Sequence, residues 1–431
     1  MKVLIIGAGI GGLTAALELE RAGIEAQVFE SVAEVRPLGV GINLLPHAIK
    51  NLTRLGLLKT LLQTGLETKD LSYYNKYGQR IWSEPRGRAA GYNVPQLSIH
   101  RGELQMILMA AARERLGARV RTGKHLRAFR ETPDGTVIAE FVDRESGIAV
   151  GEETGDVLVA ADGINSTVRS SFYPNEGAPI WNGVLFWRAA TETEPFLGGR
   201  SMIMAGHPKQ KFVAYPMSQK HAVRGTSLVN WIAELWFDPS LGFKRQHWLW
   251  FDPSLGFKRQ HWNRRGNTAD FLPAFRSWDF EWLNIPNLIE QTTDVYEFPC
   301  VDRDPLPRWT FGRVTLLGDA AHPMYPMGSN GSSQAILDGR ALANALSTHP
   351  RIEDALDSYE QTRRAATTKI VLSNRQSGPE RVMGVVEDRS PNGFTDLDTV
   401  ISHRELQEIA DKYKVMTGSD AESVNAELEK S

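Results

Sequence analysis

The chain has 431 residues, 42% of them hydrophobic, which is enough apolar material for about two or three packed domains. Its 49 Lys and Arg nearly balance its 51 Asp and Glu, and no dense basic run occurs, so nucleic acid is excluded as an expected partner. The apolar run after Met1 turns directly into glycine and no stretch reaches membrane-spanning length. We therefore expect a cytoplasmic protein without a signal peptide or membrane segment.

The single cysteine, Cys300, excludes an intrachain disulfide framework and a Cys-x-x-Cys redox pair. The ten histidines are scattered, and no His-Glu-x-x-His or clustered Cys/His pattern is present to hold a metal. We expect no metal site. Any redox chemistry then requires a bound organic cofactor.

The N-terminal thirty residues follow the order strand, tight turn, helix, strand. Apolar residues 3–6 lead into the turn Gly7-Ala8-Gly9-Ile10-Gly11-Gly12, a helical pattern runs from Leu13 to Ala22, and residues 26–29 form the second strand. In this context the glycine spacing indicates a dinucleotide site. Gly7 permits the turn, Gly9 lets a pyrophosphate approach the backbone, and Gly12 lets helix and strand pack closely.

The helix that follows this turn points its free N–H groups and positive dipole end at the phosphates. Glu30, at the end of the second strand, is placed to accept hydrogen bonds from an adenosine ribose. The fingerprint alone leaves NAD and FAD open.

The rest of the chain shows three patterns of predicted secondary structure. A helix is predicted from Gly102 to Leu116, followed by strands near Val120 and Val137. From Trp181 to about Pro299, aromatic residues and short alternating runs are typical of an antiparallel sheet. The alternation of strand and helix returns with a strand at 314–317 and a helix at 332–346. Residues from 355 onward are rich in helix formers.

We therefore predict an α/β fold with a Rossmann-like cofactor domain interrupted by a second domain. The cofactor domain comprises residues 1–72, 98–178 and 296–375. A mostly antiparallel sheet domain for the substrate comprises 73–97 and 179–295, and residues 376–431 form a C-terminal helical region.

Two identical copies of fourteen residues stand in the predicted sheet domain. LWFDPSLGFKRQHW occupies 235–248 and is repeated at 249–262. A solenoid needs several diverged repeats, so two perfect copies do not indicate one. We expect a loop extension whose shortening by one copy leaves cofactor binding and turnover intact.

Two further motifs follow predicted strands. The strand at 157–161 runs into Asp162-Gly163-Ile164-Asn165-Ser166, and the strand at 314–317 runs into Gly318-Asp319-Ala320-Ala321-His322-Pro323 and then 324–331, Met-Tyr-Pro-Met-Gly-Ser-Asn-Gly. With the N-terminal fingerprint, and in this order, they resemble the three motifs of the class A, single-component FAD-dependent aromatic hydroxylases. The resemblance implies an FAD-dependent monooxygenase that takes electrons from NADH or NADPH and reacts with O2.

The resemblance also assigns roles to matching positions. Asp162 and Gly163 would lie near the pyrophosphate and the nicotinamide path, Asp319 would bind the ribityl chain, and Arg101 would contact the diphosphate unless it is only a solvated helix-end charge. The loop from Pro326 to Gly331 would lie along the isoalloxazine, where a helix N-terminus stabilises the anionic reduced flavin. The cofactor-binding residues predicted in this way are Gly7, Gly9, Ile10, Gly11, Gly12, Glu30, Arg36, Gly41, Arg101, Asp162, Gly163, Gly318, Asp319, Pro326, Gly328, Ser329, Asn330 and Gly331.

Within the family the likeness extends to phenazine-carboxylate hydroxylases, on residues 36–43, 82–87, 98–105 and 301–307. It implies hydroxylation of an aromatic or heteroaromatic small molecule, phenazine-carboxylate-like, with or without decarboxylation. It is weakest where the substrate should bind. Hydroxylation of salicylate or another hydroxybenzoate is the alternative, because the cofactor motifs are shared.

Pockets form preferentially at domain interfaces, so we expect the substrate between the flavin and the sheet. Candidate lining residues are Trp187, Met204 and Tyr215 from the sheet and Met324 from the flavin loop, although the three sheet residues also suit core packing. Candidate catalytic residues are His322, Tyr325 and Pro326. His322 is either a base toward a substrate hydroxyl or a structural part of the third motif.

Three other classes of flavoprotein compete with the hydroxylase. A flavin halogenase is disfavoured because Glu281 and Leu283 stand where its motif has tryptophans, and a disulfide-type flavin reductase is excluded by the lone cysteine. A flavin-binding protein without catalytic activity stays open, although all three cofactor motifs are intact.

Overall fold

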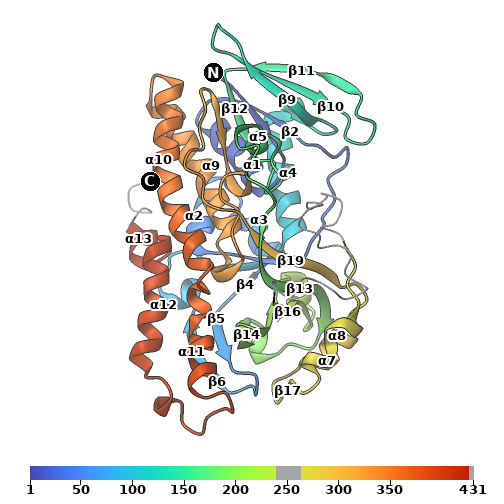
Figure 1. Ribbon diagram of the computed structural model, residues 1–431, viewed down its shortest axis with the longest axis vertical. Helices are drawn as coiled ribbons and strands as arrows, with labels where there is room; N and C mark the ends of the chain where they lie inside the picture. Colours follow the sequence, from blue (N-terminus) through green and yellow to red (C-terminus); the bar gives the residue numbers. More distant parts are fainter. Residues whose placement is uncertain (239–263, 427–431) are drawn as a thin grey trace.

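The computed structural model describes residues 1–238 and 264–426. A parallel sheet with its helices occupies one end of the molecule, a larger, mostly antiparallel sheet occupies the other, and the C-terminal helices run along one side of both (Figure 1). This is the predicted α/β architecture with a helical C-terminal region. None of the helices in the described ranges is long and apolar enough to cross a membrane.

The parallel sheet has five strands in the order β20-β12-β1-β2-β8, and every pairing is parallel. The strands are β1 Lys2–Ile6, β2 Glu25–Phe29, β8 Val120–Arg121, β12 Val157–Ala160 and β20 Val314–Leu316. Val3 and Leu4 are both fully buried, as expected when both faces of a parallel sheet are covered. Helix α1, Ile10–Arg21, packs against α4, Arg101–Leu116, and α9, Gly331–Thr348.

The second sheet has seven strands in the order β19-β13-β16-β15-β14-β5-β6. They are β5 Asp70–Tyr74, β6 Arg80–Pro85, β13 Ile180–Thr193, β14 Ser201–His207, β15 Gln210–Pro216, β16 Ser227–Trp236 and β19 Tyr296–Asp302. All pairings are antiparallel except β5 with β14. Because β19 pairs with β13, the sheet takes up residues that the sequence assigned to the cofactor domain.

A third sheet was not foreseen as a unit. Strands β9 His125–Glu131, β10 Val137–Val142 and β11 Ala149–Gly155 form an antiparallel meander at the end of the molecule (Figure 1). Most residues of β9 and β11 reach solvent, so the apolar alternation that marks a strand in sequence is weak there.

Shorter elements complete the two main domains. They are β3 Gly41–Leu44, β4 Leu66–Glu67, β7 Leu97–His100, β17 Asp279–Phe280, β18 Leu283–Asn284, α2 Pro46–Arg54, α3 Leu58–Thr64, α5 Thr167–Phe172, α6 Gln219–Val223, α7 Leu272–Phe275 and α8 Ile285–Glu290.

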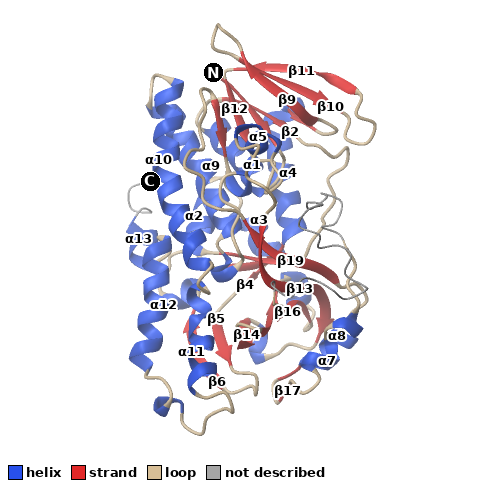
Figure 2. Ribbon diagram, in the orientation of Figure 1, coloured by secondary structure: helices blue, strands red, loops and turns tan. Residues whose placement is uncertain are grey.

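The C-terminal helices are α10 Ile352–Asn374, α11 Arg381–Arg389, α12 His403–Thr417 and α13 Ala421–Ala426 (Figure 2). Residues of α11 and α12 join Met204 and neighbouring side chains of the seven-stranded sheet in one hydrophobic cluster. The helical region therefore contributes to the core of the second domain.

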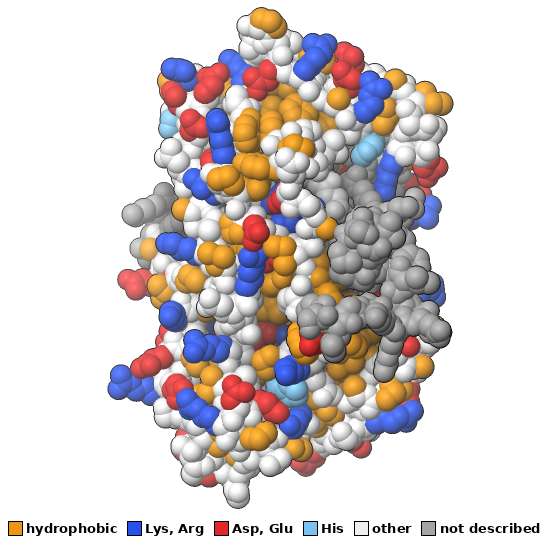
Figure 3. Space-filling model, viewed as in Figure 1, with side chains coloured by type: hydrophobic (Ala, Val, Ile, Leu, Met, Phe, Trp, Pro, Cys, Tyr) orange, Lys and Arg blue, Asp and Glu red, His pale blue; other side chains and the backbone are white. Residues whose placement is uncertain are grey.

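The duplicated segment begins inside the described part of the chain, because Leu235 and Trp236 end β16. Residues 239–263 lie outside the described residues, and so does the predicted loop extension. On the face shown in Figure 3, positive and negative side chains of the described residues are interspersed.

Candidate active site

The three sequence motifs meet at one edge of the parallel sheet. Gly7 follows β1 directly, Asp162 stands two residues after β12, and Gly318 stands two residues after β20. β12 lies between β1 and β20 and runs parallel to both. Ligands of such sheets bind outside the carboxyl ends of the strands. Segments more than 300 residues apart therefore form one site.

The turn after β1 fits a pyrophosphate. A Cβ atom built on Gly9 would meet nothing within 4 Å, so open space lies against the backbone there. A Cβ on Gly12 would collide with the carbonyl oxygen of Gly7, so only glycine allows helix and turn to approach. Gly9 caps α1 without a side-chain hydrogen bond, which leaves the first N–H groups of Ile10 and Gly11 to a ligand.

Two side chains fix this turn from outside. Glu30 accepts the N–H of Ala8 at 2.9 Å and the N–H of Val32 at 3.0 Å. Gln105, which the sequence reasoning missed, donates from Nε2 to the carbonyl of Ala8 at 2.8 Å. Gln105 stands one turn after Arg101 on α4, and that i, i+4 spacing was the available signal.

The segment from Arg36 to Gly41 crosses the start of α4. The N–H of Arg101 donates to the carbonyl of Val40 at 2.9 Å, and the Arg101 side chain is exposed beside Gly39. Arg36 is exposed and forms its ion pair with Glu34 at 2.6 Å. The structure thus places Arg101 at the site and directs Arg36 toward a surface carboxylate.

The third motif is held by a buried carboxylate. Asp338 of α9 accepts the N–H of Gly318 at 3.0 Å, His322 Nε2 lies 2.6 Å from it, and Arg363 donates to it at 2.7 Å. Burial alone would raise the pKa of Asp338, but His322 and Arg363 hold it at about 2. His322 is buried and committed to this network, so its candidate role as a base toward substrate is corrected to a structural one.

Asp319 projects from the same motif and stays in contact with solvent, although protein surrounds it on most sides. This loss of hydration raises the pKa of its carboxyl, while His322 and Arg101 oppose the rise. A solvent-accessible carboxylate close to Arg101 suits the hydroxyl groups of a ribityl chain. The motif around Asp162 is tied in from β12, since its Oδ2 accepts the N–H of Thr167 at 2.8 Å.

The residues predicted in the flavin loop, residues 324–331, differ in their exposure to solvent. Pro326 is exposed and Met324 is half-buried, so both can line a ligand site. Tyr325 is buried, and its hydroxyl lies 3.4 Å from the carbonyl oxygen of Ile180. Because Tyr325 packs in a buried cluster with Val184 and Phe186, its catalytic role is corrected to a packing one; burial and the charge of Asp302 also raise its pKa.

The three residues predicted to line the substrate site from the sheet lie on two different faces of it. Trp187 pairs with Ala233 on the face that packs against α7, where it stacks on Phe271 with centroids 4.9 Å apart. Met204 and Tyr215 lie on the opposite face, in a cluster that includes residues of α11. Successive residues of a strand point to opposite faces of the sheet. Trp187 therefore points away from the cofactor domain, toward which Arg188 points, and the expectation that Trp187 lines the substrate site is wrong.

Arg188, the next residue along β13, faces the cofactor domain and was missed by the sequence reasoning. It donates to the carbonyl of Gly41 at 3.0 Å, while Asn230 accepts the N–H of Gly41 at 2.7 Å. Burial lowers the pKa of the Arg188 guanidinium; Tyr215 opposes this change and Arg101 adds to it. A single charged residue in the apolar run 184–190 was the signal that could have found it.

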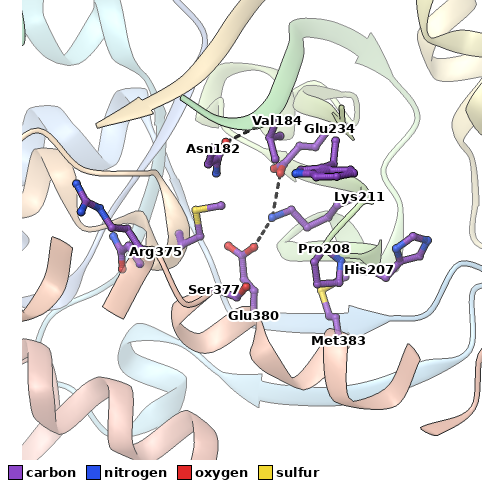
Figure 4. Close-up of a pocket in the computed structure, with 13 residues that line it drawn as sticks. Asn182, Val184, His207, Pro208, Lys211, Glu234, Arg375, Ser377, Glu380 and Met383 are labelled. Atoms are coloured by element: carbon purple, nitrogen blue, oxygen red, sulfur yellow. Dashed lines mark hydrogen bonds and ion pairs between the residues drawn. The ribbon is translucent and has the colours of Figure 1, made fainter. Parts of the chain in front are cut away.

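A pocket of about 170 Å³ opens beside Met327 of the flavin loop, between the seven-stranded sheet and the C-terminal helices (Figure 4). Lys211 of β15 lies 3.0 Å from Glu234 of β16 and also pairs with Glu380 from the start of the helical region. This triad joins the sheet to the helices. No group of three His, Cys, Asp or Glu side chains in the described ranges could hold a metal ion.

Comparison with known proteins decides the family. Residues 1–235 and 297–374 match the family described as "FAD binding domain". The chain belongs to this family of FAD-dependent aromatic hydroxylases. It uses FAD, with NAD(P)H as reductant, and is a flavoprotein monooxygenase that acts with O2 on a small aromatic molecule.

Relatives and solved structures agree with this assignment. The chain is 46% identical to phenazine 1,6-dicarboxylic acid hydroxylase PhzS of Lysobacter antibioticus, over 86% of this chain and 89% of the relative. It is 30% identical to 3-hydroxybenzoate 6-hydroxylase 1 of Aquipseudomonas alcaligenes, over 87% and 88%. The fold is similar to that of a salicylate hydroxylase substrate complex, with a TM-score of 0.72, 20% identity, and coverage of 99% and 97%.

Proposed function

We propose that this monooxygenase hydroxylates a ring-containing carboxylic acid of the phenazine-carboxylate kind. The observation that carries the proposal is Arg188. In the described part of the chain its Nε–H has no hydrogen-bond partner, and its other N–H groups bond the carbonyl of Gly41 and the hydroxyl of Tyr215. The 46% identical relative is named for a phenazine dicarboxylic acid, which supports the same substrate class.

Arg188 is half-buried and forms no ion pair within the described residues, and a guanidinium that loses hydration without a paired carboxylate is costly to maintain. Its planar fork suits a carboxylate, which it binds with charge-assisted hydrogen bonds. Arg188 and Tyr215 lie where the sheet meets Gly41, and ligand pockets are common at such junctions. A substrate carboxylate bound there would compensate the charge and orient the ring toward the flavin loop.

The cofactor roles of the predicted binding residues belong to the same proposal. Bound FAD supplies the oxygen chemistry: two electrons come from NAD(P)H, one oxygen atom enters the ring and the other leaves as water. The chain's task is to hold the ring, with Pro326 and Met324 from the loop, and to keep bulk water out. If the hydroxyl enters at the carbon that bears the carboxylate, carbon dioxide leaves. We place the enzyme in the cytoplasm, where NAD(P)H is supplied.

The test titrates the FAD-loaded enzyme with phenazine-1-carboxylate, hydroxybenzoates and unsubstituted phenazine, and follows flavin absorbance, NAD(P)H oxidation, hydroxylated product and peroxide. We expect Arg188→Met to weaken binding of the carboxylate about 100-fold, since truncating one partner of a buried charge pair costs several kcal/mol. Arg188→Lys, which keeps the charge but loses the fork, should fall between. Unsubstituted phenazine should bind the native enzyme and both variants equally.

The outcomes separate the alternatives. Turnover of hydroxybenzoates without turnover of phenazine carboxylates would favour the hydroxybenzoate reading. A bound flavin whose oxidation no ring acid stimulates would indicate a flavin-binding protein without this activity. Equal loss of all ligands in Arg188→Met would assign the arginine to the fold or to FAD rather than to a carboxylate.

A further inference from the structure

One side chain of the C-terminal helices reaches the flavin loop. Tyr413 of α12 is buried, and its hydroxyl accepts the Nδ2–H of Asn330 at 3.0 Å. The same hydroxyl lies 3.2 Å from the carbonyl oxygen of Met327 and 2.9 Å from Oδ1 of Asn374, so it donates to one of the two. Burial raises the pKa of Tyr413, and the hydroxyl keeps the proton that it donates.

The loop has a conformation that needs outside support. Its turn, η9 Met327–Ser329, contains Gly328 at φ +70° and Ser329 at φ +56°. A left-handed conformation costs energy at a serine, so contacts around it must fix it. A Cβ atom at Gly328 would lie 2.6 Å from Cε1 and Cζ of Tyr413. The turn is therefore shaped directly against the tyrosine ring.

A second hydrogen bond ties the start of the loop to the same support. Asn374, the last residue of α10, donates from Nδ2 to the carbonyl of Tyr325 at 2.9 Å. Asn374 and Tyr413 thus hold backbone or side-chain atoms at Tyr325, Met327 and Asn330. The family match ends at residue 374, so Tyr413 is a contribution of the chain beyond it.

We propose that Tyr413 is a positioning residue that fixes the Pro326–Gly331 loop in the conformation that receives the flavin. It acts through the amide of Asn330 and through the proton that it donates to Met327 or Asn374, and touches neither substrate nor reacting atoms in this role. Loss of its hydroxyl frees the loop to move, which exposes the reduced flavin to water. Released peroxide should then increase relative to hydroxylated product.

The test compares Tyr413→Phe with the native enzyme by FAD titration, visible spectrum, flavin reduction potential and peroxide yield. We expect FAD to bind about tenfold more weakly, since a lost buried hydrogen bond of this kind corresponds to that factor. The flavin spectrum and potential should shift, and the peroxide fraction should rise several-fold with the ring acid bound.

Tyr92→Phe is the matched control. The Tyr92 hydroxyl donates to the carbonyl of Ser419 at 2.6 Å, so it fastens the same helical region without contacting the flavin loop. We expect this variant to lose some thermal stability and to keep native flavin affinity, spectrum and peroxide yield. Native flavin properties in Tyr413→Phe, or equal flavin losses in both variants, would overturn the proposal.

Discussion

Lys211 lies between two carboxylates that are as buried as it is. Glu234 is 3.0 Å from its Nζ atom, Glu380 pairs with it from the helical region, and all three side chains are less than 10% exposed. One ammonium cannot fully compensate two carboxylates in a medium of low polarity. Burial raises the pKa of Glu234 to about 7, because the attraction of Lys211 is smaller than the loss of hydration.

This carboxyl makes the stability of the fold depend on pH. The folded pKa lies above the ordinary value of 4.5, so the folded state holds the proton more tightly than the unfolded state. The contribution is complete below pH 4.5 and is lost as the pH rises through 7. We expect Glu234→Gln to flatten the decline of the unfolding free energy across this window by up to about 3 kcal/mol. Denaturant unfolding between pH 4.5 and 8 measures it.

Glu140→Gln serves as the comparison, because Glu140 pairs with the exposed Arg127 on the meander sheet. Its pH profile should match that of the native protein. A Glu234→Gln variant with the native slope would mean that Glu234 stays ionised beside Lys211 over the whole range.

Elements with local signals were predictable from the sequence. The helix predicted from Gly102 begins at Arg101, and the helix predicted around 332–346 spans Gly331–Thr348, because turns and apolar periodicity mark their ends. Strand β13 carried no such signal. Val184 to Trp187 are all buried, because α7 and α8 cover one face of β13 and the loop with Tyr325 and Met327 covers the other, so the alternation that would assign faces is lost.

The site could be predicted only where its residues are adjacent in sequence. The glycine turn, Asp162 and Asp319 stand in motifs, whereas the side chains that hold those motifs come from distant helices. Asp338 and Arg363 reach the third motif from α9 and α10, and Tyr413 lies 83 residues from Asn330. Such partners are set by packing, for which no local pattern exists.

Helix α5 connects the second motif to the third through Arg169. Its Nη1 donates to the carbonyls of Ala320 and Ala321, each at 3.0 Å, and its Nε donates to Glu176 at 2.8 Å. We expect Arg169→Met to lower the unfolding free energy by about 3 kcal/mol, because two buried carbonyls lose their donor and Glu176 keeps only its pairing with Arg303. FAD affinity should fall as well, since Asp319 immediately precedes these carbonyls.

Urea unfolding with and without excess FAD measures both effects. Arg404→Met is the control, because Arg404 is 89% exposed and pairs within its own helix with Glu408. It should change stability by less than about 0.5 kcal/mol. A native-like Arg169→Met would show that the two motifs hold each other without α5.

The duplicated segment connects two fixed points of the molecule. Phe237, the third residue of the first copy, donates to the carbonyl of Gly183 at 2.7 Å; two residues after the second copy, the carbonyl of Arg264 accepts the N–H of Glu297 at 3.0 Å. Across the strands the two points are separated by about three strand spacings, and along β13 by about four residues. Together these offsets give a distance of about 20 Å. Residues 239–263 number 25, and removal of one copy of 14 leaves 11.

Eleven residues span up to about 35 Å, so the shortened connection is long enough to join the two points. We therefore expect deletion of residues 249–262 to leave the folded protein, FAD binding and turnover unchanged, as measured by thermal unfolding, flavin titration and the ring-acid assay. Because the copies are identical, deleting 235–248 gives the same chain. Deleting both, 235–262, also removes the last two residues of β16 and should destabilise the sheet. Loss of flavin or of soluble protein on deletion of one copy would show that the connection carries contacts on which the second domain depends.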